Sequence, residues 1–249
     1  GIRLFNSLNI SMTLISGGGF LPTDSLNNII SSNFQKIAFI FSLLLSMFNF
    51  YIVFNIFNKK ILIRDHKEDM YLMFLTIILI VFIYFNHNSG LDLIIGVISS
   101  LATSGLTLMK ADNLSLYFLF ITLIGGSLVS NTSGIKLARF YILLKIASAE
   151  IMKLISPNSV INKTIFNSEK KITDDNVKIS FLIFISFFLS LFILSSFLVL
   201  DNIGFEKSFK LSILTLTNTV NSELFNMENL NFANLLTTSK ISLIIFMII

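Results

Sequence analysis

The chain has 249 residues, 54% of them hydrophobic and 13% charged, with a formal net charge of +4 at pH 7. Soluble domains carry about 25% charged residues, so this composition excludes an ordinary soluble protein and predicts an integral membrane protein. The absence of Cys excludes disulfides, thiolate chemistry and most zinc sites, and the two histidines, His66 and His87, lie too far apart in sequence to predict a metal site.

Apolar segments of two lengths alternate along the chain. The longer ones carry no charge and predict membrane spans or parts of them, at residues 37–58, 70–85, 113–135 and 179–200. Two runs are shorter: residues 89–101 lie between the second and third of these segments, and residues 205–216 follow the last. Runs of about 10 to 14 apolar residues are too short to cross a bilayer, and we interpret them as re-entrant helices.

Three polar loops follow short helical segments. They cover residues 15–20 (first loop), 102–107 (second loop) and 217–222 (third loop), and they combine small hydroxyl residues with glycine or asparagine but carry no charge. Irregular backbone at membrane depth is tolerated only where it is buried in protein or lines a water-filled path. The loops therefore suggest an ion path, although ordinary extracellular turns are the alternative for any one of them.

The elements follow a repeating order of span, short helix, polar loop and span. We therefore predict an all-α membrane fold of repeated span–pore helix–filter loop–span units around one pore. Residues 1–58 would be the end of repeat two, residues 70–155 repeat three with a broken second span, and residues 179–249 a truncated repeat four. Residues 59–69 and 156–178 would be cytoplasmic linkers between them. We expect the chain to be part of a longer protein.

The basic residues predict the orientation of these units. Residues 58–69 and 145–178 hold most of the Lys and Arg, and such loops face the cytoplasm. The three polar loops should then open to the outside.

Backbone carbonyls can replace the hydration shell of a cation without a fixed charge that would hold the ion too tightly. Turning successive carbonyls to one side requires backbone angles that glycine adopts best, which singles out Gly19 and Gly105. The C-terminal end of the short helix at 91–101 would add the negative end of its dipole, and Ser89 with Asp92 resembles a capping box at its start.

Residues 114–155 as one straight helix would be about 63 Å long, twice the roughly 30 Å hydrocarbon core. We place a break at residues 125–134, where glycines flank a stretch rich in hydroxyl groups. Two interpretations are open: a gate in the ion path, or a kink whose small residues allow close helix packing. Lys136 either faces the path and repels cations or is a cytoplasmic anchor.

Three motifs resemble those of one known superfamily. Residues 16–20 are similar to a Ser-Thr-Gly-Gly-Phe filter loop, and residues 101–107 are similar to an Ala-Thr-Thr-x-Gly-Phe-Thr loop. Residues 125–139 align without gaps with the intramembrane motif Gly-Gly-x-x-Gly-Ser-Thr-Gly-Gly-Gly-x-Lys-x-x-Arg. On these motifs the chain resembles the Trk/Ktr/HKT superfamily of potassium transporters, and most closely the bacterial Trk potassium-uptake membrane subunit.

The resemblance implies four repeats around one pore in a multi-pass protein of the bacterial cytoplasmic (inner) membrane. It implies potassium uptake, with the potassium ion as transported substrate and no cofactor. It also implies a homodimer that lies in the lipid bilayer and binds a cytosolic nucleotide-binding regulatory subunit. It implies no nucleic-acid partner. No nucleophile–base pair or acidic cluster lies within the spans, so we do not expect an enzyme.

The resemblance also assigns site residues. The filter would comprise Gly17, Gly18, Gly19, Thr103, Ser104, Gly105, Thr219, Val220 and Asn221, and the gating loop would comprise Gly125, Gly126, Ser130, Asn131, Thr132, Ser133, Gly134 and Lys136. The departures of the chain from the family include Asn221, Val129 and Ser133, where glycine is expected. A non-conducting, decayed remnant or a scaffold membrane protein of the same fold is therefore the second hypothesis.

Overall fold

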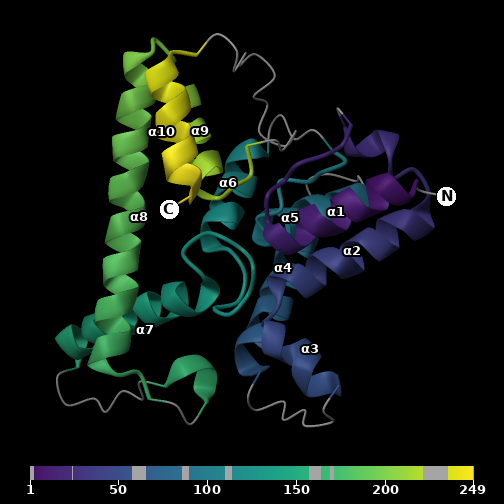
Figure 1. Cartoon of the computed structure of the whole chain (residues 1–249). Coiled ribbons are helices and arrows are strands. Elements are labelled where there is room, and N and C mark those ends of the chain that lie inside the picture. The colour runs from purple at the N-terminus through teal and green to yellow at the C-terminus, as the bar shows by residue number, and fades with distance from the viewer. Residues whose placement is uncertain are drawn as a thin grey trace.

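The computed structural model in Figure 1 describes residues 3–23, 25–57, 66–85, 90–109, 114–156, 164–168, 171–220 and 235–248. Ten α-helices and two short 3-10 helices dominate these residues, and the only β-pairing among them is an isolated bridge between Thr164 and Lys171. The helices are α1 (Leu4–Ser16), η1 (Leu26–Asn28), α2 (Asn33–Met47), α3 (Phe50–Phe57), α4 (Lys67–Tyr84), α5 (Gly90–Leu101), α6 (Ser115–Ile124), α7 (Leu137–Ile155), η3 (Ile165–Asn167), α8 (Asp174–Leu200), α9 (Phe205–Leu216) and α10 (Thr237–Ile248).

Side-chain caps start two of the helices before the apolar runs begin. At α2, the Ser32 hydroxyl accepts from the Gln35 N–H, and the Gln35 side-chain oxygen accepts from the Ser32 N–H, which is a capping box. At α8, the Thr173 hydroxyl accepts from the Asn176 N–H. Both helices therefore begin several residues earlier than the predicted spans 37–58 and 179–200.

Two helices, α2 and α3, cover residues 37–57 of the predicted span 37–58, with a break between them. The break falls at Asn49, whose backbone N–H donates to an Asp69 carboxylate oxygen at 3.0 Å. The Asn49 side-chain oxygen accepts from the Tyr51 N–H at 2.9 Å. Such local side-chain bonds offer the backbone an alternative to the helical ladder, and here they end one helix and start the next.

The short helix α5 lies at the centre of the fold (Figure 1), packed against α2, α4 and α6. Every residue from 95 to 101 is buried, although the helix is only 12 residues long. Helices α2, α4, α5 and α6 form one group. A second group forms around α8, which contacts α7, α9 and α10. Contacts between α6 and α9 join the two groups.

Among the described helices, α8 alone is both long and apolar enough to cross a membrane, by the criteria of length and composition. Shorter apolar helices are α2, α5, α6 and α10. Helix α4 has 18 residues, but its first three, Lys67, Glu68 and Asp69, are charged. Large apolar side chains on α8, such as Leu182 and Phe181, are exposed.

Candidate functional site

The short helices α1, α5 and α9 end in loops with the same backbone course. After each helix the chain turns through a positive φ, which is 65° at Gly17, 46° at Thr103 and 55° at Asn218. The N–H of the next residue then donates to a carbonyl five residues earlier, from Gly18 to Thr13 at 3.3 Å, from Ser104 to Ser99 at 3.1 Å and from Thr219 to Leu214 at 2.8 Å. This shared hydrogen bond aligns the three loops residue by residue.

The alignment places Val220 level with Gly19 and Gly105. The sequence had suggested Asn221 for this position, one residue further along. Gly19 and Gly105 both adopt positive φ, 69° and 67°, whereas Val220 is not among the described residues with positive φ. A β-branched residue disfavours that region strongly, so the third loop leaves the common course at Val220.

The three loops meet although they are far apart in the sequence. A methyl group placed on Gly19 would lie 3.0 Å from the Ser104 carbonyl oxygen and 3.3 Å from the Asn218 carbonyl oxygen. One placed on Gly105 would lie 3.2 Å from the Thr219 Cα atom and 3.5 Å from the Gly19 Cα atom. The loops therefore pack backbone against backbone, at a distance that leaves no room for a side chain.

Hydroxyl groups hold the shape of the loops. In the first loop, the Thr13 hydroxyl donates to the Phe20 carbonyl oxygen at 2.7 Å. In the second loop, the Ser99 and Ser104 hydroxyls are hydrogen-bonded at 2.8 Å, and in the third loop the Thr217 and Thr219 hydroxyls are hydrogen-bonded at 2.8 Å. Thr103, Ser104, Thr217 and Thr219 are all at most 1% exposed. The second and third loops are therefore braced inside the protein, whereas Ile15 and Phe20 of the first loop are exposed.

A fourth irregular segment, residues 125–136, interrupts the helix between α6 and α7. Three of its residues have positive φ, which is 70° at Gly125, 85° at Gly134 and 76° at Lys136. Inside the segment, the Gly126 N–H donates to the Thr132 hydroxyl at 3.0 Å. The segment is therefore a closed loop with its own internal bonds and not a simple helix kink.

The Lys136 side chain is buried and is bonded within the segment. Its ammonium donates to the Ser130 carbonyl oxygen at 3.1 Å, to the Ser130 hydroxyl at 3.3 Å and to the Thr132 hydroxyl at 2.9 Å, and it also bonds the Thr132 carbonyl oxygen. Neither sequence interpretation of Lys136 anticipated this role. The ammonium group binds four oxygen atoms of Ser130 and Thr132 and so stabilises the fold of segment 125–136.

Segment 125–136 forms backbone hydrogen bonds with the break between α2 and α3. The Ser127 N–H donates to the Met47 carbonyl oxygen at 3.1 Å, and the Val129 carbonyl oxygen accepts from the Phe50 N–H at 2.9 Å. Two groups freed by the end of one helix and the start of the other are thereby satisfied. On the other side, the Leu128 N–H donates to a Glu68 carboxylate oxygen at 2.6 Å.

Segment 125–136 also contacts all three loops. A methyl group on Gly17 would lie 3.2 Å from the Asn131 carbonyl oxygen. The Ser133 hydroxyl donates to the Thr217 carbonyl oxygen at 2.6 Å and contacts the Thr103 hydroxyl at 3.1 Å, and the Ser133 N–H donates to the same Thr103 hydroxyl at 2.8 Å. The predicted filter and gate residues in the described part of the chain therefore form one contiguous cluster.

Relatives of this chain are known. No protein-family model matches it. An uncharacterized cation transporter of Methanocaldococcus jannaschii is 29% identical over 206 residues, which is 80% of this chain and 41% of that protein. The Trk system potassium uptake protein TrkG of Escherichia coli strain K12 is 32% identical over 222 residues, which is 83% of this chain and 45% of that protein.

The fold has a relative among solved structures. The crystal structure of the potassium transporter TrkH from Vibrio parahaemolyticus matches with a TM-score of 0.85, covering 99% of this chain and 56% of that one at 20% sequence identity. This chain belongs to the Trk family of potassium transporters. It spans less than half the length of the two curated relatives.

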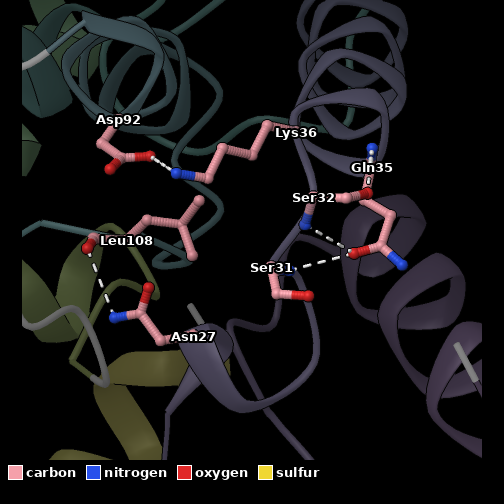
Figure 2. A network of polar contacts seen from close by, with 7 residues as sticks. All are labelled: Asn27, Ser31, Ser32, Gln35, Lys36, Asp92 and Leu108. Atoms are coloured by element: carbon pink, nitrogen blue, oxygen red, sulfur yellow. Dashed lines mark hydrogen bonds and ion pairs between the residues drawn. The ribbon is translucent and has the colours of Figure 1, made fainter.

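The sequence missed a polar network that joins two parts of this Trk family chain (Figure 2). Lys36, on α2, donates to an Asp92 carboxylate oxygen on α5 at 2.6 Å. The Asn27 amide reaches the Leu108 carbonyl oxygen at 3.4 Å, just beyond the second loop. Asp92 had been assigned to a capping box with Ser89, but Ser89 lies outside the described residues.

We expect the exchange of Lys36 for Met to weaken this junction only slightly. The pair is 56 residues apart in sequence, and its side chains are 18% and 33% exposed. Partly exposed ion pairs contribute about 0.2–1 kcal/mol, and Met retains most of the packing of the lysine stem. Thermal unfolding in detergent should show a loss of that size, smaller at high salt, and a loss that does not change with salt would contradict the ion-pair account.

Two residues named in the sequence analysis lie outside the described part of the chain. They are Asn221, predicted as a filter residue of the third loop, and His87, considered with His66 as a metal ligand. Within the described residues, no group of three or more His, Cys, Asp or Glu side chains could hold a metal ion.

Proposed function

We propose that this Trk family chain takes up potassium ions through a filter of backbone carbonyls. The observation that carries the proposal is the meeting of the three loops at Gly19, Gly105 and Thr219, backbone against backbone. Carbonyls can replace the hydration shell of an ion without a fixed charge. The curated relative TrkG is a potassium uptake protein by name, which supports potassium as the substrate.

The register of the loops refines which carbonyls would meet the ion. In the first two loops they are those of Gly17 and Gly18, and of Thr103 and Ser104. In the third loop the shared hydrogen bond favours Asn218 and Thr219 over the predicted pair Thr219 and Val220. Each of the three helices would point its negative C-terminal end toward the ion.

The wider architecture belongs to the same proposal. The helices α1, α5 and α9 would be pore helices, and α2, α4, α8 and α10, with the broken pair α6 and α7, would be the flanking spans of repeats two, three and four. The exposed apolar surface of α8 would face lipid in a bacterial cytoplasmic membrane. The linkers at residues 59–69 and 156–178 would face the cytoplasm, where a nucleotide-binding regulatory subunit would bind a homodimer.

Segment 125–136 would be the gate of this path. It contacts each of the three loops through Asn131 or Ser133. Glycines with positive φ lie at its first residue, 125, and near its other end, at 134, and the conformational freedom of glycine would let the stretch between them move as a unit. Its contact with the loops would block the exit of the ion.

Uptake of rubidium by the full-length protein in a host that lacks its own potassium uptake tests the proposal. We expect saturable uptake above that of the host carrying the empty vector. Normal membrane insertion without uptake would contradict it.

The second candidate function is a non-conducting membrane protein of the same fold. Val220 favours it, because this residue stands where the other two loops have glycine with positive φ. We expect Val220→Gly to increase rubidium uptake. A non-glycine residue loses about 1–2 kcal/mol in the left-handed region, so glycine should populate the common loop course roughly 5- to 30-fold more.

Asn202→Gly is the matched control for this substitution. Asn202 also has a positive φ, 58°, but it lies between α8 and α9, away from the loops. The control should leave uptake unchanged. Uptake that is unaffected by Val220→Gly, or raised equally by both substitutions, would contradict the role of Val220.

A further inference from the structure

The contact at residue 133 uses a side chain that the family motif does not supply. The motif has glycine at this position, whereas this chain has Ser133. Its hydroxyl donates to the Thr217 carbonyl oxygen at 2.6 Å and contacts the Thr103 hydroxyl at 3.1 Å. Glycine could make only the backbone bond from residue 133 to Thr103. A chain with the glycine of the motif at this position would lack both side-chain contacts.

These contacts join three separate parts of the molecule at one atom. Thr103 follows α5 in the second loop, and Thr217 follows α9 in the third loop, while Ser133 belongs to segment 125–136. Thr103 and Thr217 are both fully buried, so water does not replace a lost bond there easily. Rotation of one side chain would nevertheless release both contacts together.

A cavity adjoins the same side chain. It has a volume of about 380 Å³ and lies between Ser133 and Gly134 on one side and α8 and α10 on the other, where Ser186, Ser190 and Met247 line it. Residues 133 and 134 therefore have space beside them into which they can move.

We propose that Ser133 is a positioning residue that latches segment 125–136 against the second and third loops. Release of the latch lets residues 133 and 134 move toward the cavity and frees the path at the loops. The proposal rests on the proposed function of the segment as a gate. It adds that this chain holds its gate closed more firmly than a family member with glycine at this position.

Exchange of Ser133 for Ala removes the hydroxyl and keeps the backbone preferences of the segment. A net hydrogen bond contributes about 0.5–1.5 kcal/mol, so we expect rubidium uptake at saturation to rise roughly two- to tenfold. The concentration at half-saturation should change little, because the loops keep their own braces. Ser186→Ala is the matched control: Ser186 lines the same cavity, but its hydroxyl bonds the Ile183 carbonyl oxygen of its own helix.

A second measurement reports the latch without relying on transport. Spin labels can be attached to N131C, on the segment, and L189C, on α8, in the full-length protein, once any Cys outside these 249 residues has been replaced. Asn131 and Leu189 are both exposed. Electron paramagnetic resonance should give one main distance with Ser133 and a second, distinct distance after Ser133→Ala, but not after Ser186→Ala.

The two readouts separate the latch from the transport function. A second distance together with higher uptake supports both proposals. A second distance in a protein that takes up no rubidium supports the latch and contradicts the proposed function. An unchanged single distance after Ser133→Ala overturns the latch, whatever the uptake.

Discussion

Exchange of Gly105 for Ala is expected to abolish rubidium uptake. Gly105 has a φ of 67°, where any residue with a side chain is strained, and the added methyl group would lie 3.2 Å from the Thr219 Cα atom. That neighbour is backbone and cannot rotate away. The second and third loops would have to separate, and the carbonyls that replace the hydration shell would no longer face one ion.

Gly90→Ala separates strain from crowding. Gly90 also has a positive φ, 54°, but no atom lies within 4 Å of its added methyl group. The left-handed conformation alone costs about 1–2 kcal/mol, which should lower stability at residue 90 but preserve uptake. Uptake assays on membranes with matched protein amounts measure the difference. Equal losses in the two variants would mean that the contact between the loops is not required.

Exchange of Gly126 for Ala is expected to detach segment 125–136 from α2. The added methyl group would lie 2.6 Å from the Met47 carbonyl oxygen and 2.9 Å from two side-chain atoms of Thr132. The first of these belongs to the backbone of α2, which also accepts the Ser127 N–H. Overpacking of this kind costs about 1–3 kcal/mol, and thermal unfolding of the purified protein should show a loss in that range.

Gly204→Ala is the control for this substitution, since no atom lies within 4 Å of its added methyl group. Spin labels on N131C and L189C should also report a displaced segment in Gly126→Ala and not in Gly204→Ala. A Gly126→Ala protein with unchanged stability and an unchanged distance would contradict the contact with Met47.

The features that the sequence predicted well depend on local chemistry. The short helices α5 and α9 lie within one residue of the predicted runs 89–101 and 205–216. The helical break between α6 and α7 lies where glycines flank hydroxyl residues. The resemblance to the Trk family, which rested mainly on the motif at 125–139, is confirmed by the relatives and by the shared fold.

The features that the sequence missed depend on contacts between distant residues. The third loop was aligned one residue too late, since its register follows from the bond of Thr219 to Leu214 and not from a glycine. Asn218 was the available signal, because Asn tolerates the left-handed region better than other non-glycine residues. The break at Asn49 depends on Asp69, 20 residues away, and no local pattern reveals it.

A cation is expected to bind where the three loops meet. Crystals of the full-length protein grown with rubidium or thallium would test it most directly, through the anomalous scattering of the bound ion. We predict a peak enclosed by the carbonyls of residues 17–18, 103–104 and 218–219, absent when a large organic cation replaces the metal. Intact loops with no peak between them in either metal would contradict the account.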